Sequence, residues 1–177
     1  MYKKNRNKKK IKAFFFDRDN TLIKDNGYTF KKKQLKFLSG TIKAIQFLKK
    51  ARILVVVITN QSGIARKYFK LTDVINFHKY LNKKLSLYKC KIDDFFICGC
   101  HPNFSKNKCK CRKPSPKMIN QALKKWKLKK DEVIMIGDKK TDKIASKKAG
   151  VIFFYKKKFS LYKQVKLILK RNDLPLL

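Results

Sequence analysis

The sequence predicts an α/β fold in which a central parallel sheet is packed between layers of helices. Short apolar and β-branched runs alternate with longer segments in which apolar residues recur every three or four positions. The runs show no polar alternation, which is typical of parallel strands that are covered on both faces. A length of 177 residues suits one domain with a full hydrophobic core, and the chain has no internal repeat and no long linker.

Strands and helices are expected to alternate along the chain. The five expected strands are residues 12–16, 52–60, 92–98, 133–138 and 151–155. The expected helices carry apolar stripes, which are Ile42, Ile45 and Leu48 in residues 41–50; Val74, Phe77, Leu81 and Leu85 after a cap at Thr72; Ile119, Ala122, Leu123 and Trp126 after Ser115-Pro116; and Leu161, Val165, Ile168 and Leu169 in the last helix.

The net charge of +37, from 48 basic and 11 acidic residues, is compatible with a nucleic-acid partner. Of the basic residues, 42 are Lys and six are Arg, whereas base and phosphate recognition usually relies on the planar Arg fork. Lys, Asn, Ile and Phe also have A/T-rich codons, so drift in an A/T-rich genome is the other explanation. Under either explanation, the few Asp and Arg residues that persist are expected to be needed.

The N-terminal segment MYKKNRNKKK is basic enough to begin a signal peptide, but the apolar run after it, Ala13 to Phe16, is too short. No apolar run approaches the roughly 20 residues that span a bilayer. We therefore expect a cytoplasmic protein without a membrane partner. It would consist of a basic tail over residues 1–11 and one domain over residues 12–177.

Polar residues follow the predicted strands at the edge where open parallel sheets bind ligands. They are Asp17-Arg18-Asp19 after the first strand, Thr59-Asn60-Gln61-Ser62-Gly63 at the end of the second, Arg112-Lys113 after the third strand and its loop, and Gly137-Asp138 after the fourth. Each segment alone would suit a turn or a helix cap. Their convergence on one edge favours a shared functional site.

These residue types suit phosphoryl transfer. A carboxylate can attack phosphorus and form an aspartyl-phosphate, and a hard cation such as Mg²⁺ neutralises the like charges. A second carboxylate two residues further on can protonate the leaving alkoxide and then deprotonate the hydrolytic water. A Lys and a hydroxyl can bind the phosphate oxygens on which charge accumulates in the transition state.

Four motifs, FFFDRDNTLI, VVVITNQSGIAR, CRKP and IMIGDKKTD, resemble those of the haloacid dehalogenase (HAD) superfamily of phosphatases, in the same order and over most of the chain. The resemblance implies a three-layer, Rossmann-like HAD fold. It also implies that Asp17 is the nucleophile, that Asp19 is the general acid/base, and that Thr59 and Lys113 bind the phosphoryl group. By the same resemblance, Mg²⁺ would be bound by Asp17, the backbone carbonyl of Asp19, and Asp138.

The sequence departs from the family pattern at Asn20, where Gly is usual. Asn tolerates a left-handed backbone almost as well as Gly, so we expect activity to be retained. Asp142 lies one helical turn beyond Asp138 and is expected to support the site from behind the groups that touch the substrate.

The loop ICGCHPNFSKNKCKCRKP, residues 97–114, holds four of the five cysteines as two Cys-x-Cys pairs. In a cytoplasmic chain such pairs indicate metal ligands rather than disulfides, and four soft donors suit a structural Zn²⁺. Cys90 and His78 lack such spacing and are expected in the core or at its boundary. The expected zinc ligands are Cys98, Cys100, Cys109 and Cys111, with His101 as the alternative to Cys100.

The zinc loop, residues 98–111, resembles that of the HAD phosphatases that include D-glycero-D-manno-heptose 1,7-bisphosphate 7-phosphatase and the histidinol-phosphatase domain. The run NQSGIAR and the segment Asp25-Asn26-Gly27-Tyr28 favour the heptose substrate. Arg112 would bind the second phosphate or the sugar, a role suited to a bidentate cation. The substrate contacts that the resemblance implies are Arg18, Asp25, Asn26, Gly27, Tyr28, Asn60, Gln61, Ser62, Arg112 and Lys139.

We therefore expect a monomeric, Mg²⁺-dependent phosphatase that removes the 7-phosphate of this small phosphorylated sugar. No large cap domain fits in 177 residues, so the loops 24–38 and 98–112 would roof an open site. Histidinol phosphate or another small phosphomonoester is the alternative substrate. A 3′-end phosphatase of polynucleotides, which shares the Thr-Asn-Gln-x-Gly-Ile run, or a basic nucleic-acid-binding protein is the alternative of a different class. The cysteine loop and the intact Asp and Lys residues argue against that class.

Overall fold

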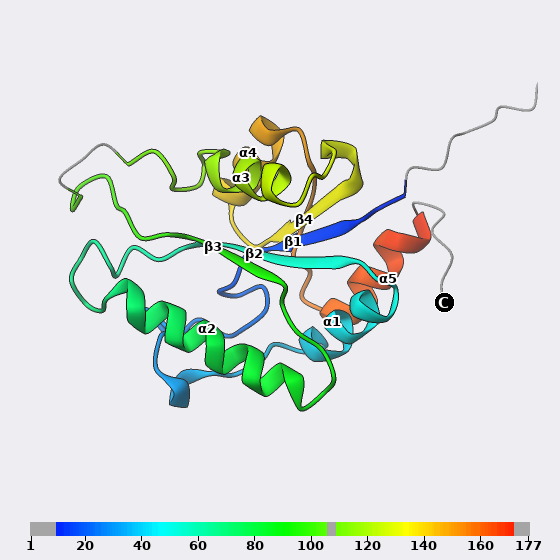
Figure 1. Ribbon diagram of the computed structural model, residues 1–177, viewed down its shortest axis with the longest axis horizontal. Helices are drawn as coiled ribbons and strands as arrows, with labels where there is room; N and C mark the ends of the chain where they lie inside the picture. The colour runs from blue at the N-terminus through cyan, green and yellow to red at the C-terminus, as the bar shows by residue number, and fades with distance from the viewer. Residues whose placement is uncertain (1–9, 106–108, 172–177) are drawn as a thin grey trace, which may run out of the picture.

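The computed structural model of the chain describes residues 10–105 and 109–171 (Figure 1). Residues 1–9 of the expected basic tail, residues 106–108 of the zinc loop and residues 172–177 lie outside the described part of the chain. Ile11 is 2% exposed and belongs to the hydrophobic core. The packed part of the domain therefore begins one residue earlier than the expected boundary at residue 12.

Five parallel strands form one sheet in the order β3-β2-β1-β4-β5. Their bounds are β1 (Ala13–Phe16), β2 (Leu54–Asn60), β3 (Asp94–Cys98), β4 (Val133–Gly137) and β5 (Ile152–Tyr155). All five expected strands are confirmed, and each expected boundary lies within two residues of the observed one. The first strand of the chain is central, so the loops that leave β2, β1 and β4 lie side by side at one edge of the sheet.

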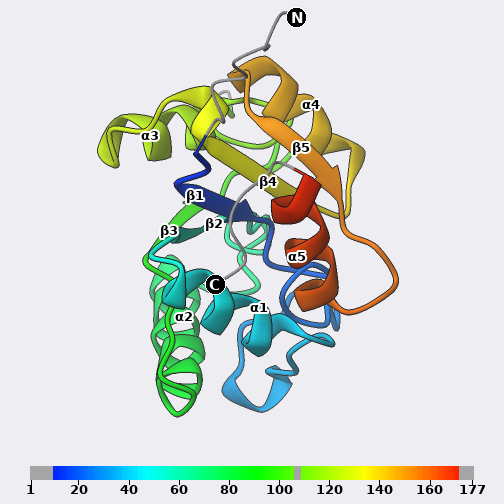
Figure 2. The same ribbon diagram turned by 90° about the vertical axis from the view of Figure 1, so that its right-hand side faces the viewer.

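Helices cover both faces of the sheet, which gives the three layers seen in Figure 1 and Figure 2. Three helices lie on one face and two on the other: α1 (Thr41–Lys50), α2 (Leu71–Ser86) and α5 (Leu161–Arg171), opposite α3 (Lys117–Lys125) and α4 (Lys140–Ala149). Because side chains alternate along a strand, Phe14 and Phe16 join the core under the first group of helices and Phe15 joins the core under the second. The three-layer α/β architecture predicted from the sequence is confirmed.

The structure corrects two features of the expected helices. The second helix begins at Leu71, one residue before the expected cap at Thr72. Trp126 ends α3 and is 37% exposed, and its indole N–H donates to Asp94 Oδ2 over 3.0 Å instead of packing in the core. A tryptophan at the end of an apolar stripe can turn its polar edge to a surface partner, which the spacing alone does not reveal.

Helix α4 carries no apolar stripe by which it could have been predicted. Its buried residues are Asp142, Ala145, Ser146 and Ala149, which are small or polar. Such a face gives a weak helical period in hydrophobicity. The Ser146 hydroxyl donates to the Asp142 carbonyl over 2.8 Å, which satisfies it inside the helix.

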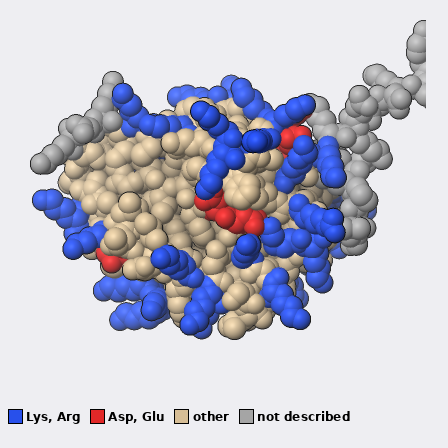
Figure 3. Space-filling view, viewed as in Figure 1, with Lys and Arg blue, Asp and Glu red and all other residues tan. Residues whose placement is uncertain are grey.

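Basic side chains are dispersed over the molecule. In Figure 3 Lys and Arg are spread over much of the visible face and its edge, while the largest group of acidic side chains lies near its middle. On this face they form no continuous basic groove of the kind with which proteins usually bind single-stranded nucleic acids. Within residues 10–105 and 109–171, no helix is long and apolar enough to cross a membrane.

Phe15→Ala is expected to lower the free energy of unfolding by ~3–5 kcal/mol, because Phe15 is 0% exposed at the centre of the sheet. The matched control Phe159→Ala removes the same side chain from a position that is 44% exposed, and its cost should be about 0.5 kcal/mol. Urea unfolding followed by circular dichroism measures both values. Equal losses in the two variants would contradict the placement of Phe15 in the core.

Candidate active site

Asp17 follows β1 directly and is fixed by the sheet. Its backbone N–H donates to the Ile136 carbonyl over 2.9 Å, so pairing with β4 continues past the last residue of the strand. The residue is only 6% exposed. A carboxylate on a backbone held in this way is aimed in one direction, as a nucleophile needs to be.

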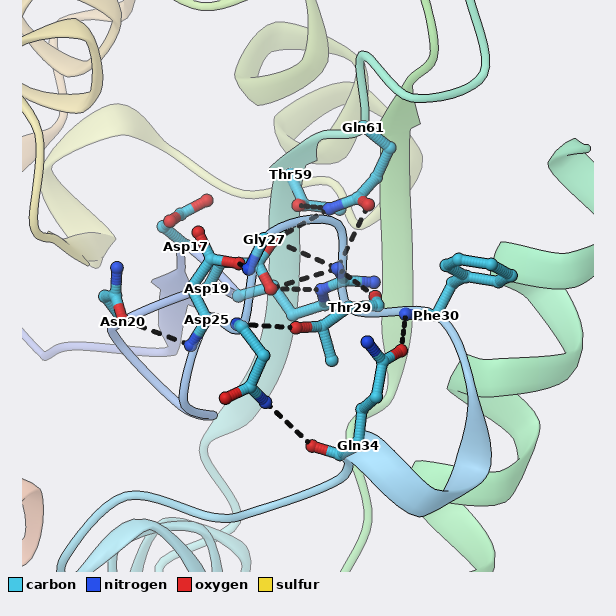
Figure 4. A network of polar contacts seen from close by, with 12 residues as sticks. Asp17, Asp19, Asn20, Asp25, Gly27, Thr29, Phe30, Gln34, Thr59 and Gln61 are labelled. Carbon is cyan, nitrogen blue, oxygen red and sulfur yellow. Dashed lines mark hydrogen bonds and ion pairs between the residues drawn. The ribbon is translucent and has the colours of Figure 1, made fainter. Parts of the chain in front are cut away.

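The chain turns sharply after Asp19. Asn20 has a φ of 56°, in the left-handed region that Asn enters at low cost. Its N–H donates to the Ile23 carbonyl over 2.8 Å, and its side-chain Oδ1 accepts from the N–H of Asp25 over 3.1 Å (Figure 4). The expectation that Asn can take the usual place of Gly is confirmed for the backbone.

Lys113 is a buried cation, 2% exposed, that two carboxylates share. Its Nζ lies 2.7 Å from Asp17 Oδ1 and 2.6 Å from Asp142 Oδ1, and it donates to the Ile58 carbonyl over 2.7 Å. Burial acts to lower the pKa of Lys113, but the two carboxylates outweigh burial and the pKa is raised. The lysine is therefore charged and suited to bind a phosphoryl oxygen.

Asn60 holds the backbone of Lys113 in place. The N–H of Lys113 donates to Asn60 Oδ1 over 3.0 Å, and Asn60 Nδ2 donates back to the Lys113 carbonyl over 3.2 Å. Asn60 is the last residue of β2 and also lines the cavity described below. This reciprocal pair fastens the loop after β3 to the sheet, so the lysine reaches the site from a loop without being mobile.

Three carboxylates meet beside this lysine. Asp17, Asp138 and Asp142 each bring an oxygen within 4.8 Å of the others. Burial, together with the charge of Asp17, raises the pKa of Asp138 to about 6, and Asp138 Oδ1 is buried without a partner among the described residues. Crowded carboxylates with an unpartnered oxygen fit a divalent cation that prefers oxygen ligands.

Asp142 lies closer to the predicted catalytic groups than expected. It touches Lys113 directly, and its Oδ2 accepts from the backbone N–H of Lys139 over 3.0 Å. Gly137 makes this approach possible, because a Cβ on Gly137 would lie 2.7 Å from Asp142 Cβ. A side chain at the end of β4 would therefore push Asp142, and with it the first turn of α4, out of the site.

Asp19 lies in a dense network of polar contacts (Figure 4). Arg18 Nε and Nη2 donate to its two carboxylate oxygens over 3.1 and 3.0 Å, and Gln61 Nε2 donates to Oδ2 over 2.9 Å. Burial raises the pKa of Asp19, and the Asp17 carboxylate adds to this, although the charge of Arg18 opposes it. A raised pKa suits a carboxyl group that must donate a proton.

Arg18 does not reach the substrate side of the site. It is 0% exposed, and besides Asp19 its guanidinium donates to the Thr29 carbonyl over 2.7 Å and to Gln61 Oε1 over 3.0 Å. The prediction of a substrate contact from Arg18 is therefore corrected, because the side chain is used inside the protein. Nothing in the local motif indicates the direction in which this side chain points.

A cavity of about 700 Å³ opens at this edge of the sheet. The predicted site residues in its wall are Asp17, Asp19, Asp25, Gly27, Tyr28, Asn60, Gln61, Ser62, Arg112, Lys113 and Lys139. The wall also contains residues that were not predicted to contact a ligand, namely Pro102, Cys109, Pro114, Ser115, Thr141, Asp142 and Lys148. Thr141, Asp142 and Lys148 come from α4, which the sequence pattern did not reveal.

Thr59 is buried against the side chain of Gln61. It is 0% exposed, and its Oγ1 accepts from Gln61 Nε2 over 2.8 Å. A hydroxyl that accepts one hydrogen bond can still donate its own hydrogen. A phosphoryl oxygen could therefore be bound there, and the role of Thr59 stays a prediction.

The loop after β1 contributes Asp25, Gly27 and Tyr28 to the cavity wall. Gly27 and Tyr28 have positive φ values of 69° and 57°, and Asp25 Oδ1 accepts from the Gly27 N–H over 3.0 Å. Asn26 is absent from the cavity wall, and its side-chain amide donates to the Gln34 carbonyl over 3.3 Å. Asn26 is exposed between two residues of the cavity wall, and its substrate contact stays a prediction.

The four loop cysteines form one cluster. Their sulfurs lie within 4.8 Å of one another. The structure joins them as two disulfides, Cys98–Cys111 and Cys100–Cys109, which differs from the expected free thiolates. Cys100 Sγ also lies 3.4 Å from Cys98 Sγ and 3.5 Å from Cys111 Sγ. His101 lies outside the cluster, with its Nε2 3.3 Å from an arginine side chain. Cys100, rather than His101, is therefore the fourth member of the set.

His78 and Cys90 are interior residues, 3% and 5% exposed, as predicted. Cys90 packs in the core that α1, α2 and α5 cover. The ring of His78 stacks on that of Phe95, and its Nε2 lies 3.2 Å from Arg18 Nη1. This link between the histidine and the site was missed, because the two residues are 60 positions apart in the sequence.

Comparison with known families matches residues 74–155 to the haloacid dehalogenase-like hydrolases. The D-glycero-beta-D-manno-heptose-1,7-bisphosphate 7-phosphatase of Pasteurella multocida is 37% identical over 143 residues, which cover 79% of this chain and 78% of the relative. The D-glycero-alpha-D-manno-heptose-1,7-bisphosphate 7-phosphatase of Photorhabdus laumondii is 38% identical over 147 residues, which cover 80% of this chain and 80% of the relative.

A solved structure is similar over nearly the whole chain. It is that of D,D-heptose 1.7-bisphosphate phosphatase from B. bronchiseptica, complexed with magnesium and phosphate. The TM-score is 0.77 at 26% sequence identity, and the match covers 93% of this chain and 89% of the other. The fold that the four motifs predicted is therefore confirmed.

In the metal-free protein, Asp138→Asn is expected to raise the free energy of unfolding at pH 7 by roughly 1 kcal/mol. The folded pKa of about 6 lies above the ordinary 3.8, so the contribution of Asp138 to stability falls as the pH rises from about 4 to about 6. For a fully buried group, a pKa shift of this size would lower the free energy of unfolding at pH 7 by about 3 kcal/mol. The expected effect is smaller here because Asp138 is half-buried and partly screened by solvent. Urea unfolding with a chelator at pH 4 and pH 7 measures the difference.

Asp25→Asn is the matched control, because Asp25 lines the cavity outside the carboxylate cluster. It should leave the free energy of unfolding unchanged at both pH values. Added Mg²⁺ should stabilise the wild-type protein and Asp25→Asn but not Asp138→Asn. A loss of stability in metal-free Asp138→Asn, or equal stabilisation by Mg²⁺ in all three proteins, would contradict a cation site at the cluster.

Proposed function

Because this chain belongs to the haloacid dehalogenase-like hydrolases, we propose that it is a Mg²⁺-dependent phosphatase that removes the 7-phosphate of D-glycero-D-manno-heptose 1,7-bisphosphate. The observation that carries the proposal is the placement of Asp17, Asp19 and Lys113 in the wall of one cavity, in a chain whose relatives at 37% and 38% identity are named for this reaction. The relatives are named for both anomers, so the proposal covers the bisphosphate without a choice between α and β.

The chemistry divides into two half-reactions. In the first, a carboxylate oxygen of Asp17 attacks phosphorus and the bond from phosphorus to the C7 oxygen breaks. Asp19, whose pKa is raised, gives its proton to the leaving alkoxide, and an aspartyl-phosphate remains on Asp17. In the second, a water molecule gives a proton to Asp19 and attacks phosphorus. Inorganic phosphate is released and Asp17 is restored.

Lys113 and Thr59 are proposed to bind the phosphoryl oxygens. Lys113 already donates to Asp17 over 2.7 Å, so the same ammonium can bridge the attacking carboxylate and the phosphate. Mg²⁺ would be held by Asp17, Asp138 and the backbone carbonyl of Asp19, and would neutralise the charge that keeps the two anions apart. The raised pKa of Asp138 and its unpartnered Oδ1 support this ligand set.

Arg112 is proposed to bind the second phosphate. Its Nη1 is buried and has no partner among the described residues, so a donor is available for a bidentate contact. Lys139, Tyr28, Ser62 and Asp25 line the same cavity and are proposed to contact the rest of the substrate. The cavity of about 700 Å³ suits a small bisphosphate, and one chain supplies every group, which supports a monomer.

The four loop cysteines are proposed to bind a structural zinc ion. Tetrahedral Zn²⁺ with sulfur ligands at about 2.3 Å places the sulfurs about 3.8 Å apart. The four sulfurs already lie within 4.8 Å of one another, and reduction of the two disulfides would free all four as ligands. Cys111 directly precedes Arg112 and Lys113, so zinc would fix the segment that carries both cations. Reduced cysteines fit a cytoplasmic protein, which is the location we propose.

Phosphate release with Mg²⁺ from heptose 1,7-bisphosphate, histidinol phosphate and a 3′-phosphorylated oligonucleotide tests the substrate. The kcat/KM for the bisphosphate should exceed the others by ~100-fold or more, which is ~2.7 kcal/mol of transition-state discrimination. Asp17→Asn should stay folded and zinc-loaded but show no turnover.

A preference for histidinol phosphate would change the substrate and keep the chemistry, whereas turnover in Asp17→Asn would overturn the nucleophile. Turnover of the oligonucleotide alone, falling steeply between low and moderate salt, would give the basic surface a function.

Protein purified without added metal should contain about one zinc ion per chain. Titration of the unfolded protein without reductant, with a chelator present, should then find all five cysteines as free thiols. Two disulfides would leave one thiol and no zinc. Cys90→Ser, the matched control, should lower the thiol count by one and leave the zinc in place. Cys109→Ser should lose zinc and lower kcat/KM by ~10–100-fold, because the Arg112-Lys113 segment is released.

A further inference from the structure

Arg18 is a buried guanidinium whose donors are used by several parts of the fold. Nε and Nη2 clamp the two carboxylate oxygens of Asp19, and Nη2 also donates to Thr29 and Gln61. The remaining amino group, Nη1, lies 3.2 Å from Nε2 of His78. A buried charged group needs acceptors for its donors, since an unmet donor costs free energy. His78 is therefore a partner that Arg18 depends on.

Only one tautomer of His78 fits this contact. A guanidinium has donors and no acceptor, so Nε2 must accept and can carry no proton. The proton of the neutral ring is then on Nδ1, which is buried without a partner among the described residues. Burial, together with the charge of Arg18, lowers the pKa of His78 well below its ordinary value, in agreement with a neutral ring.

The ring of His78 is fixed by its neighbours. It stacks on Phe95 of β3 with 4.2 Å between ring centroids and an interplanar angle of 15°. The adjacent Phe77 places its own ring centroid 5.2 Å from the Arg18 guanidinium carbon. Helix α2 therefore meets the guanidinium with two consecutive residues, one through a ring nitrogen and one through a ring face.

We propose that His78 is a positioning residue for Asp19, which it orients through Arg18 by accepting a hydrogen bond at Nε2. The inference rests on the proposed role of Asp19 as the acid of the first half-reaction. Without the acceptor, the guanidinium can turn toward another partner and carry the Asp19 carboxyl group away from the leaving oxygen. His78 is not among the residues that line the active-site cavity.

The choice of leaving group separates this role from a merely structural one. A sugar alkoxide needs a proton from Asp19 as it leaves, whereas p-nitrophenolate leaves without one. For both substrates kcat/KM reports the first half-reaction, because the second begins only after the alcohol or phenol has gone. A misdirected Asp19 should therefore reduce kcat/KM for an alkyl phosphate selectively.

Two substitutions separate the hydrogen bond from the ring. His78→Phe keeps a ring against Phe95 but offers no acceptor, and His78→Gln gives up the ring but offers an acceptor oxygen. His78→Phe should lower kcat/KM for the alkyl phosphate by ~10–100-fold and that for p-nitrophenyl phosphate by less than ~3-fold. His78→Gln should regain most of this loss, and KM should change little in either variant.

Leu85→Ala is the control, because Leu85 is 0% exposed on the same helix and lies about two helical turns beyond His78. It should lower stability and leave the ratio of the two kcat/KM values unchanged. Equal losses on both substrates in His78→Phe, or the same selective loss in Leu85→Ala, would overturn the inference. If the wild-type protein prefers an alkyl phosphate other than the heptose bisphosphate, the proposed substrate fails while this test continues with the preferred ester.

A second measurement needs no turnover. The chain has two histidines, so His101→Asn leaves His78 as the only one, and ¹⁵N NMR can identify which ring nitrogen carries the proton. We expect a neutral ring at pH 7 with the proton on Nδ1. A proton on Nε2, or a doubly protonated ring, would overturn the inference even if no substrate had been found.

Discussion

Repulsion between carboxylates is the constraint on which this site depends. Asp17, Asp138 and Asp142 gather within 4.8 Å at the carboxyl ends of two central strands, where Asp17 and Asp142 are buried and Asp138 is half-buried. Lys113 offsets part of the negative charge, and Asn60 and the cysteine loop bring it there. Burial, together with the negative charge of Asp17, raises the pKa of Asp138. A cluster of carboxylates with this excess of negative charge favours a divalent cation.

The strands and the chemical motifs could be predicted because each depends on a local pattern. A strand covered on both faces needs an uninterrupted apolar run, and residues 54–60 have one. Polar residues that follow such strands must meet at one edge, whatever the details of the loops. Helix α4 could not be predicted in this way, because its buried face carries Asp142 and Ser146 for the sake of the site rather than an apolar stripe.

Side-chain direction depends on partners from distant elements, and here sequence reasoning was wrong or incomplete. Arg18 stands between Asp17 and Asp19, the two aspartates proposed to be catalytic, yet it points inward because Thr29, Gln61 and His78 supply its acceptors. Asn60 was predicted only as a substrate contact, but it also holds the backbone of a residue 53 positions away. A motif identifies which residues are present, and only the packing decides which way each of them faces.

The strand order determines when the site can be assembled during synthesis of the chain. Asp17, Thr59, Lys113 and Asp138 follow or end four different strands, and β4 docks beside β1 only after most of the sequence has been made. Until then the N–H of Asp17 lacks its partner on β4. The named site residues lie between Asp17 and Asp142, so a chain that is still emerging from the ribosome lacks part of the site until the start of α4 has been added. Each motif is local in the sequence, but the site exists only when strands from both halves of the chain have paired.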